Sequence, residues 1–406
     1  MKKILIFIIV SIFTGAEVIW AQPASPAEPM KYRRSSIYSL MIKHENQKYA
    51  DTIANVFKMM PVPDKYNDHD LSVKVIGIEE KTRRVDPTDI ESFLNKNGVA
   101  SRLVSKWFDR DFTNGVCNVE MVKERGLYSA SEKDKALAAQ SLRGTAMLED
   151  AGEELIGNTF VIVNDIRYID KAKKSKTAGI FIRVIGYAAG AVLGSSDLMD
   201  AADDWADIAE SFKGFRVKVY THLYQLVWDD EIADNFYRNM YSDTPDEEKK
   251  KALEANRDKF TLKYVGTQES SGSTTSFLGI REDQPEVMVR KACQRALDEN
   301  VANLQKNFDQ FKVKVPLLST DPITAQIGKK EGITGDSKFE VLEVQINDGK
   351  TEYKHVGVIK PVPHLIWDNR FMAVEERAVG AKLGCTTFTK VSGSDFYPGM
   401  LIREIK

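Results

Sequence analysis

The sequence has few cysteines and none of the cysteine and histidine spacings that are typical of metal sites. Cys117, Cys293 and Cys385 are the only cysteines among its 406 residues. Three widely separated cysteines cannot form the dense disulfide framework of a small secreted domain, and an odd number leaves at least one thiol unpaired. Structural zinc sites use closely spaced pairs such as Cys-x-x-Cys, which are missing here. We therefore predict no metal site and interpret Cys293 as a core residue.

The chain also lacks a large charge excess of either sign. It carries 57 Lys and Arg residues against 59 Asp and Glu residues, for a net charge of −2, whereas nucleic-acid-binding domains usually show a basic excess. Its 43% of apolar residues is typical of folded proteins and not of disordered ones. Neither of the glycine-rich nucleotide-binding fingerprints, GxGxxG and GxxxxGK[ST], occurs. We expect a folded protein with no cofactor and no nucleic-acid partner.

Long apolar runs are scarce, and the two that stand out are shorter than the roughly 20 residues of a membrane-spanning helix. The first, residues 4–13, follows Lys2 and Lys3 and precedes a plausible cleavage site at Trp20-Ala21. This order is typical of a signal peptide over residues 1–21, with Gln22 beginning the mature chain. An uncleaved anchor helix is the alternative. Because no cysteine follows the run, we expect a periplasmic or otherwise exported protein without a lipid anchor.

The second apolar run, residues 178–193, includes most of the phrase GYAAGAVLG. It contains Arg183, and a charged side chain in the middle of a membrane span costs a few kcal/mol. On a helix, Gly186, Gly190 and Gly194 would lie four residues apart on one stripe, where the missing side chains let another backbone approach closely. A packing partner is therefore expected on this stripe.

The segment after this run carries a matching apolar stripe, formed by Leu198, Ala202, Trp205, Ile208 and Phe212. Together the two segments predict a helical hairpin inserted over residues 177–212. In the functional interpretation, Gly186, Gly190, Gly194 and Trp205 contact a protein partner or a second copy.

Three alternatives to this interpretation stay open. The hairpin could simply cover one face of a sheet, and residues 180–185 could form a strand because their apolar residues alternate. The basic patch at residues 171–176 is interpreted as a solvated face that compensates the acidic face after the run. The alternative is a contact of these lysines with a membrane surface or an acidic partner.

Apolar periodicity predicts a unit of helices packed on a mostly antiparallel sheet. Helices are expected over residues 48–59, 87–97, 99–108 and 129–155, and short strands over residues 71–75 and 117–122. Three longer strands should follow at residues 159–169, 215–228 and 259–265. Pro285 begins a long helix to about residue 310 that would lie across the sheet. Its apolar stripe consists of Val289, Cys293, Leu297, Val301, Leu304 and Phe308. This is the α+β class.

The last 90 or so residues change to short strands separated by turns. Strands are expected over residues 323–327, 339–346, 353–362, 386–391 and 400–405. Asn347, Asp348 and Gly349 predict a hairpin turn, because asparagine, aspartate and glycine tolerate the positive φ that such turns need. Several short strands in a small segment indicate a small C-terminal β-barrel.

These patterns define the domain organisation. We predict a signal peptide over residues 1–21, a flexible leader over 22–36, an α+β domain over 37–313 with the insertion 177–212, and a small β-barrel domain over 314–406. Pro316 and Pro322 are expected to interrupt regular structure at the boundary of the two domains.

The element order and three sequence phrases resemble known families of the bacterial cell envelope. The phrases VEMVKERG and PEVMVRKACQRALDENVANL resemble the periplasmic α/β domain of the curli secretion channel lipoprotein family. The phrase IGKKEGITGDSKFEVLEV resembles the C-terminal barrel of the flagellar assembly protein T family. The resemblance covers roughly residues 71–406 and lacks the lipidated cysteine of the curli family. It implies a role in envelope assembly and not in catalysis.

Two groups of residues are candidates for chemistry. His364, Asp368 and Cys385 could serve an envelope hydrolase, although no nucleophile elbow accompanies them. The acidic stretch of residues 64–70 misses the spacing of a calcium loop and is interpreted as a solvated turn. We therefore expect no catalytic or metal-binding residues and a non-enzymatic binding or assembly role in the cell envelope. An envelope hydrolase that uses His364 and Cys385 is the alternative.

Overall fold

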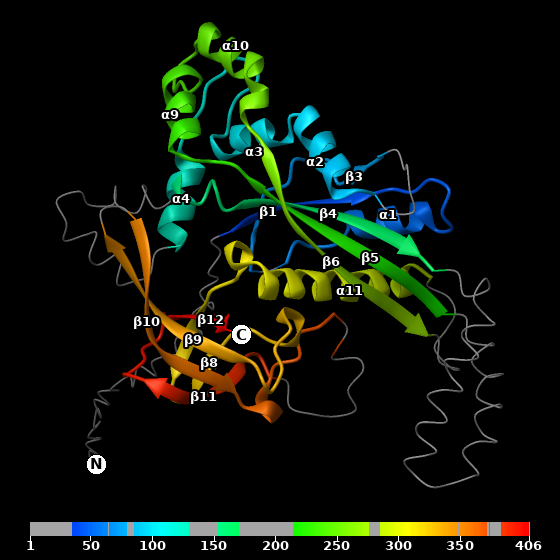
Figure 1. Ribbon diagram of the computed structural model, residues 1–406, viewed down its shortest axis with the longest axis vertical. Coiled ribbons are helices and arrows are strands. Elements are labelled where there is room, and N and C mark those ends of the chain that lie inside the picture. Colours follow the sequence, from blue (N-terminus) through cyan, green and yellow to red (C-terminus); the bar gives the residue numbers. More distant parts are fainter. Residues whose placement is uncertain are drawn as a thin grey trace, which may run out of the picture. The chain divides into compact units, whose positions relative to one another are not determined.

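The computed structural model describes residues 35–63, 65–78, 85–129, 153–169, 214–275, 285–347, 350–371, 373 and 383–405. The signal peptide, almost all of the leader and the whole predicted hairpin 177–212 lie outside these residues. The described chain forms helices and two mostly antiparallel sheets (Figure 1). The predicted α+β class is therefore confirmed.

The first sheet combines parallel and antiparallel strands. Its strands are β1 (Ser36–Ile42), β2 (Asn67–Asp68), β3 (Val75–Ile76), β4 (Thr159–Tyr168), β5 (Gly214–Leu226) and β6 (Leu262–Thr275). They are ordered β2-β1-β4-β5-β6, with β3 also paired to β1. β4, β5 and β6 are antiparallel as predicted, whereas β1 is parallel to β2, β3 and β4.

Strand β1 was not predicted, and the predicted strand at residues 71–75 is wrong. All but one residue of β1 is buried, because helices cover both faces of the sheet here. A strand buried on both faces has a continuous apolar run instead of alternation, so its sequence carries no period-two signal. Ser36, assigned to the leader, is the first residue of this strand. Only the two-residue strand β3 forms near the predicted strand.

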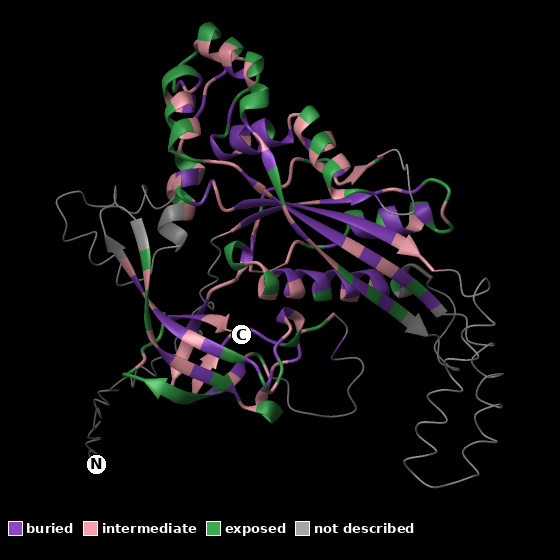
Figure 2. Ribbon diagram, viewed as in Figure 1, coloured by how far each residue is buried: buried purple, intermediate pink, exposed green. Residues whose placement is uncertain are grey.

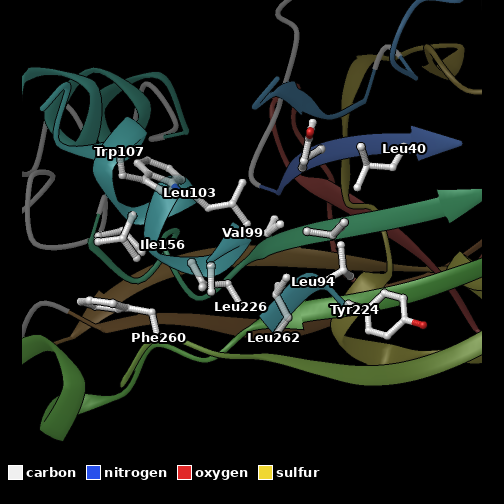
Figure 3. Packing of buried hydrophobic residues seen from close by; sticks show 14 of the residues in the cluster. Leu40, Leu94, Val99, Leu103, Trp107, Ile156, Tyr224, Leu226, Phe260 and Leu262 are labelled. Atoms are coloured by element: carbon white, nitrogen blue, oxygen red, sulfur yellow. The ribbon is translucent and has the colours of Figure 1, made fainter. Parts of the chain in front are cut away.

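Helices α2 (Pro87–Lys96) and α3 (Val99–Trp107) begin at the predicted residues and each ends one residue before the predicted end. The Asp86 side chain accepts a hydrogen bond from the Thr88 amide at 2.8 Å, and Pro87 occupies the first helical position. Gly98 takes a φ of 62° between the two helices, a conformation that glycine adopts without strain. These helices pack their apolar side chains against strands β1 and β4 in the largest core cluster (Figure 3).

The expected strand at residues 117–122 is instead an irregular segment followed by helix α4 (Glu120–Ser129). The Asn118 side chain accepts a hydrogen bond from the Glu120 amide at 3.1 Å, which satisfies one of the unpaired donors at the start of a helix. Ser129 was predicted to begin a helix over residues 129–155, and in the structure it ends α4. Local capping by a single asparagine thus outweighs the short apolar alternation of this segment.

The opposite face of the sheet is covered by α1 (Ala50–Lys58) and the long helix α11 (Pro285–Asn307), both of which were predicted. The stripe of α11 from Val289 to Leu304 is buried (Figure 2). The helix lies so close to β6 that a Cβ atom on Gly272 would be 1.8 Å from the Ala292 carbonyl oxygen. Glycine is required at this position by the close approach of two backbones.

Two further helices, α9 (Asp230–Asn239) and α10 (Glu247–Ala255), connect β5 to β6. The side chains of Asp229 and Asp246 cap them at their first turns. A short 3₁₀ turn over Arg257–Lys259 follows, so β6 begins three residues later than predicted.

The second sheet contains β7 (Val315–Thr320), β8 (Ile323–Ala325), β9 (Lys338–Asn347), β10 (Lys350–Pro361), β11 (Thr386–Gly393) and β12 (Leu401–Ile405). All of its pairings are antiparallel, and they run in the order β10-β11-β8-β7-β12-β9. Because β9 also pairs with β10, the ring of pairings is closed. Asn347 faces Lys350 in this pair, which agrees with the predicted hairpin turn; the two residues between them lie outside the described chain.

Five of these six strands were predicted, and β7 was missed. Pro316 lies within β7 opposite Leu401 and does not interrupt it. The neighbouring Leu317 donates its amide to the Met400 carbonyl at 2.8 Å, so the ladder continues on a residue that has an N–H group. Pro322 lies in the turn between β7 and β8, where it interrupts regular structure as predicted.

Candidate functional site

The predicted contact residues Gly186, Gly190, Gly194 and Trp205 all lie outside the described residues. What the structure does describe is the base from which that segment departs, at the end of the first sheet where β4 finishes and β5 begins (Figure 1). The contacts within this base determine how rigidly the ends of residues 170–213 are held.

The two strands stay paired up to their ends. Tyr168 faces Val217 in the antiparallel ladder, and beyond it the Ile169 amide donates to the Arg216 carbonyl at 2.9 Å. The chain therefore leaves and re-enters the sheet at neighbouring positions. Any structure formed by residues 170–213 is anchored at both ends to one ladder rung.

Three aromatic rings gather on one face of this base. The Tyr49 ring lies edge-on to Tyr168 at a centroid distance of 5.0 Å and to Phe215 at 5.6 Å, and the Tyr168 and Phe215 rings are 5.2 Å apart. Edge-to-face aromatic pairs at these distances contribute about 0.5–1.5 kcal/mol beyond burial. We name Tyr49, Tyr168 and Phe215 the aromatic base.

Tyr49 itself is held in an unusual conformation and remains partly accessible. It precedes α1 with a φ of 65°, the left-handed region that tyrosine rarely adopts, and 38% of it is exposed. The Lys48 ammonium lies 4.9 Å from the centre of its ring. Conformations of this kind cost about 1–3 kcal/mol and cluster at binding sites, because the surrounding structure must enforce them.

A glutamine fastens the same turn to the sheet. Gln47 donates its side-chain amide to the Ile166 carbonyl at 3.0 Å and accepts from the Tyr168 amide at 3.0 Å. These two bonds occupy backbone groups of β4 that face no other strand at this end. They fix the loop that carries Tyr49 beside the aromatic base.

The other face of the base carries an ion triad, formed by the buried His44 and Asp165 and the partly exposed Arg167. Side chains alternate along β4, so Asp165 points away from the face that holds Ile166 and Tyr168. His44 Nε2 lies 2.7 Å from one oxygen of the fully buried Asp165 carboxylate, and the Arg167 guanidinium binds both oxygens. Burial would raise the pKa of Asp165, but the hydrogen bonds from His44 and Arg167 outweigh it and lower the pKa to about 2.

The base therefore supplies rigidity and a partly exposed aromatic and cationic surface. It contains no cysteine or serine beside its histidine, so its described residues offer no nucleophile and base pair for covalent catalysis. The sequence could indicate the strand ends, but the aromatic base joins residues about 120 and 165 positions apart. That long-range contact has no local sequence signal.

The alternative catalytic residues lie in the second sheet and its connections. His364 is exposed in a short 3₁₀ turn, and Cys385 is half-buried before β11. Asp368 is buried, and its carboxylate binds the Arg370 guanidinium at 2.8 and 2.9 Å and lies 3.6 Å from the Lys329 ammonium. An aspartate neutralised by two cations is not positioned to orient a histidine as a base, as a hydrolase would require.

The acidic stretch at residues 64–70 is only partly the solvated turn that was predicted. Asp68 is exposed, but His69 is fully buried. Its Nε2 donates to the Leu103 carbonyl at 3.0 Å, and Arg125 lies 3.0 Å from its Nδ1. Burial and the positive charge of Arg125 lower the pKa of His69 to about 3, so this histidine is a neutral core residue.

The three thiols are free in the structure. Burial raises the pKa of the Cys293 thiol to about 12, which makes it unreactive. No cluster of three or more histidine, cysteine or acidic side chains suited to a metal ion occurs in the part of the chain that is described. In the same part, no helix combines the length and the apolar character needed to cross a membrane.

No protein-family model matches the chain, and no curated protein matches it significantly.

Proposed function

We propose that the chain is a secreted cell-envelope protein with a non-enzymatic binding or assembly role. Residues 177–212, including Gly186, Gly190, Gly194 and Trp205, form its contact element for a protein partner or a second copy. The likeness to the curli secretion and flagellar assembly protein T families belongs to this proposal. It supports envelope assembly as the setting.

One observation supports this proposal more than any other, namely the reinforcement of the two strand ends beside the segment. The aromatic base on one face and the ion triad on the other stabilise a place where a sheet would ordinarily need only a short hairpin. A segment that merely linked two strands would not require such support. A contact element that transmits force or orientation to a partner would.

The closed ring of strands adds a second element to the proposal. We interpret residues 314–406 as a small β-barrel domain that offers a further contact surface. Closure removes the unpaired strand edges through which sheets aggregate, so contacts of this module would be made by its loops and outer side chains.

A single substitution tests the contact element. Gly190→Leu places a bulky side chain on the glycine stripe and should abolish partner capture or self-association while leaving the thermal unfolding midpoint unchanged. Gly384→Leu is the matched control, since an added Cβ atom there meets no atom within 4 Å. Association would be measured by sedimentation velocity and by capture from envelope extracts. A stable Gly190→Leu protein that associates like the control would refute the proposal.

A further inference from the structure

A cavity of about 200 Å³ lies beside α3, and no residue of the aromatic base or the ion triad lines it. Gly98, Ser101, Arg102 and Ser105 line it from α3. Their spacing of three and four residues places them on one side of the helix. The core-facing side carries Val99 and Leu103 instead (Figure 3).

The wall of this cavity contains a buried guanidinium with unmet hydrogen-bonding groups. Arg110 is only 6% exposed, and its Nη2 donates to the Lys250 carbonyl of α10 at 3.1 Å. Its Nε and Nη1 have no hydrogen-bond partner. Buried polar groups are nearly always paired, and a buried charge without a counter-ion is strongly unfavourable, so such a group indicates a missing acceptor.

Two further arginines line the same cavity without a counter-ion. Arg102 donates to the Leu71 carbonyl at 3.3 Å, and Arg257 lies in the turn after α10. None of the three guanidinium groups pairs with a carboxylate of the described chain. The only acidic residue in the wall is the exposed Glu254. The wall therefore carries a positive charge that exceeds its negative charge by two.

The start of α3 adds donors of the same kind. Gly98 is its N-cap and provides no side-chain cap, so the first-turn amides lack an intrahelical acceptor. The hydroxyl groups of Ser101 and Ser105 donate to the carbonyls of Gly98 and Ser101 at 2.9 Å and are not available as donors. A ligand in this cavity therefore meets guanidinium N–H groups, with the N-terminus of α3 in the cavity wall, and both features favour oxyanions.

We propose that this cavity binds a phosphate group through Arg102, Arg110 and Arg257 at the N-terminus of α3. A dianion matches the excess of two positive charges, and a tetrahedral oxyanion has enough acceptors for several guanidinium N–H groups. Phe112, a wall residue that is 68% exposed, offers a ring to the organic part of a phosphate monoester. The ligand is either such a monoester or free phosphate. The inference does not depend on the proposed function.

Thermal unfolding of the full chain at pH 7.5 tests this site. Inorganic phosphate at 20 mM should raise the midpoint by about 3 °C over sodium chloride of equal ionic strength. Arg110→Met should abolish this rise. Arg257 is exposed, so Arg257→Met should leave the fold stable and weaken phosphate binding at least tenfold. Arg238→Met, which removes an exposed arginine paired with Asp234, is the matched control and should respond like the wild type.

Two further ligands, acetate and phenyl phosphate, complete the test. Acetate should give no comparable rise, because a monoanionic carboxylate matches the site poorly. Phenyl phosphate binding more tightly than inorganic phosphate would identify a monoester, and equal binding would identify the free anion. No rise with phosphate, an equal rise with acetate, or an undiminished rise in folded Arg257→Met protein would overturn the inference.

Discussion

Single residues in this protein show how burial turns a polar side chain into a structural one. His69 lies in an acidic, solvent-like stretch of sequence, yet its ring is buried beside Trp107 at a centroid distance of 5.3 Å. Both of its nitrogens have partners, one in α3 and one in α4. Nothing local in the sequence predicts this position, because it results from three elements that meet only in the fold.

The lowered pKa of His69 makes stability depend on pH. The unfolded chain binds a proton at this histidine below about pH 6.5, while the folded chain does so only near pH 3, so acidification favours the unfolded state. Between about pH 6.5 and pH 3, this histidine lowers the free energy of unfolding by about 1.4 kcal/mol for each pH unit of acidification. Chemical denaturation of the wild type and of His69→Gln between pH 7 and 4.5 checks this. The wild type should lose stability more steeply, and parallel slopes would contradict the account.

Gly272 gives a second prediction about one residue. Gly272→Ala would force a Cβ atom to within 1.8 Å of the Ala292 carbonyl oxygen, so α11 must move off β6. Overpacking of this kind costs about 1–3 kcal/mol in the free energy of unfolding. Gly77→Ala, where an added Cβ meets nothing within 4 Å, should stay within about 0.5 kcal/mol of the wild type. Equal effects of the two substitutions would show that the contact with α11 is not tight.

Whole elements were predictable where their signals are local. The signals for the helices predicted over residues 87–97 and 99–108 and the stripe of α11 are each contained in one segment, and each predicted its helix. β1 and β7 were missed for different reasons. β1 has both faces buried and therefore no alternation, and β7 contains a proline that its ladder accommodates. The strands that flank residues 177–212 were predictable, but the aromatic base and the ion triad at their ends were not.

The ion triad is the element-level feature most open to measurement. Asp165→Asn should destabilise the fold by about 2–4 kcal/mol, because it leaves Arg167 at the sheet end without its buried counter-charge. Since the pKa of Asp165 is lowered to about 2, the charged pair contributes above about pH 4 and its contribution is lost between pH 4 and 2. The control is Asp234→Asn, which breaks an exposed pair and should cost at most about 1 kcal/mol. Urea denaturation should show a smaller loss of stability from Asp165→Asn at pH 3 than at pH 7. An equal loss at both pH values would contradict the lowered pKa of Asp165.

At the scale of the whole molecule we propose that the chain is exported and that the connection from β4 to β5 departs from a reinforced end of its first sheet. Export predicts that the mature protein begins at Gln22, since the positive, apolar and small-residue segments follow the order that signal peptidase requires. Mass spectrometry of the protein recovered from the cell envelope should find Gln22 at the N-terminus. Recovery of the exported protein with Met1 intact would show that the first 21 residues are retained.

The proposed contact role of the segment between β4 and β5 is the central claim, and removal of that segment tests it directly. Because Ile169 and Arg216 are already hydrogen-bonded at 2.9 Å, residues 171–212 can be replaced by Gly-Ser-Gly without separating the strands. Sedimentation velocity and capture from envelope extracts would compare this variant with the wild type. We expect an unchanged unfolding midpoint and a complete loss of association. A variant that associates as the wild type does would contradict the account.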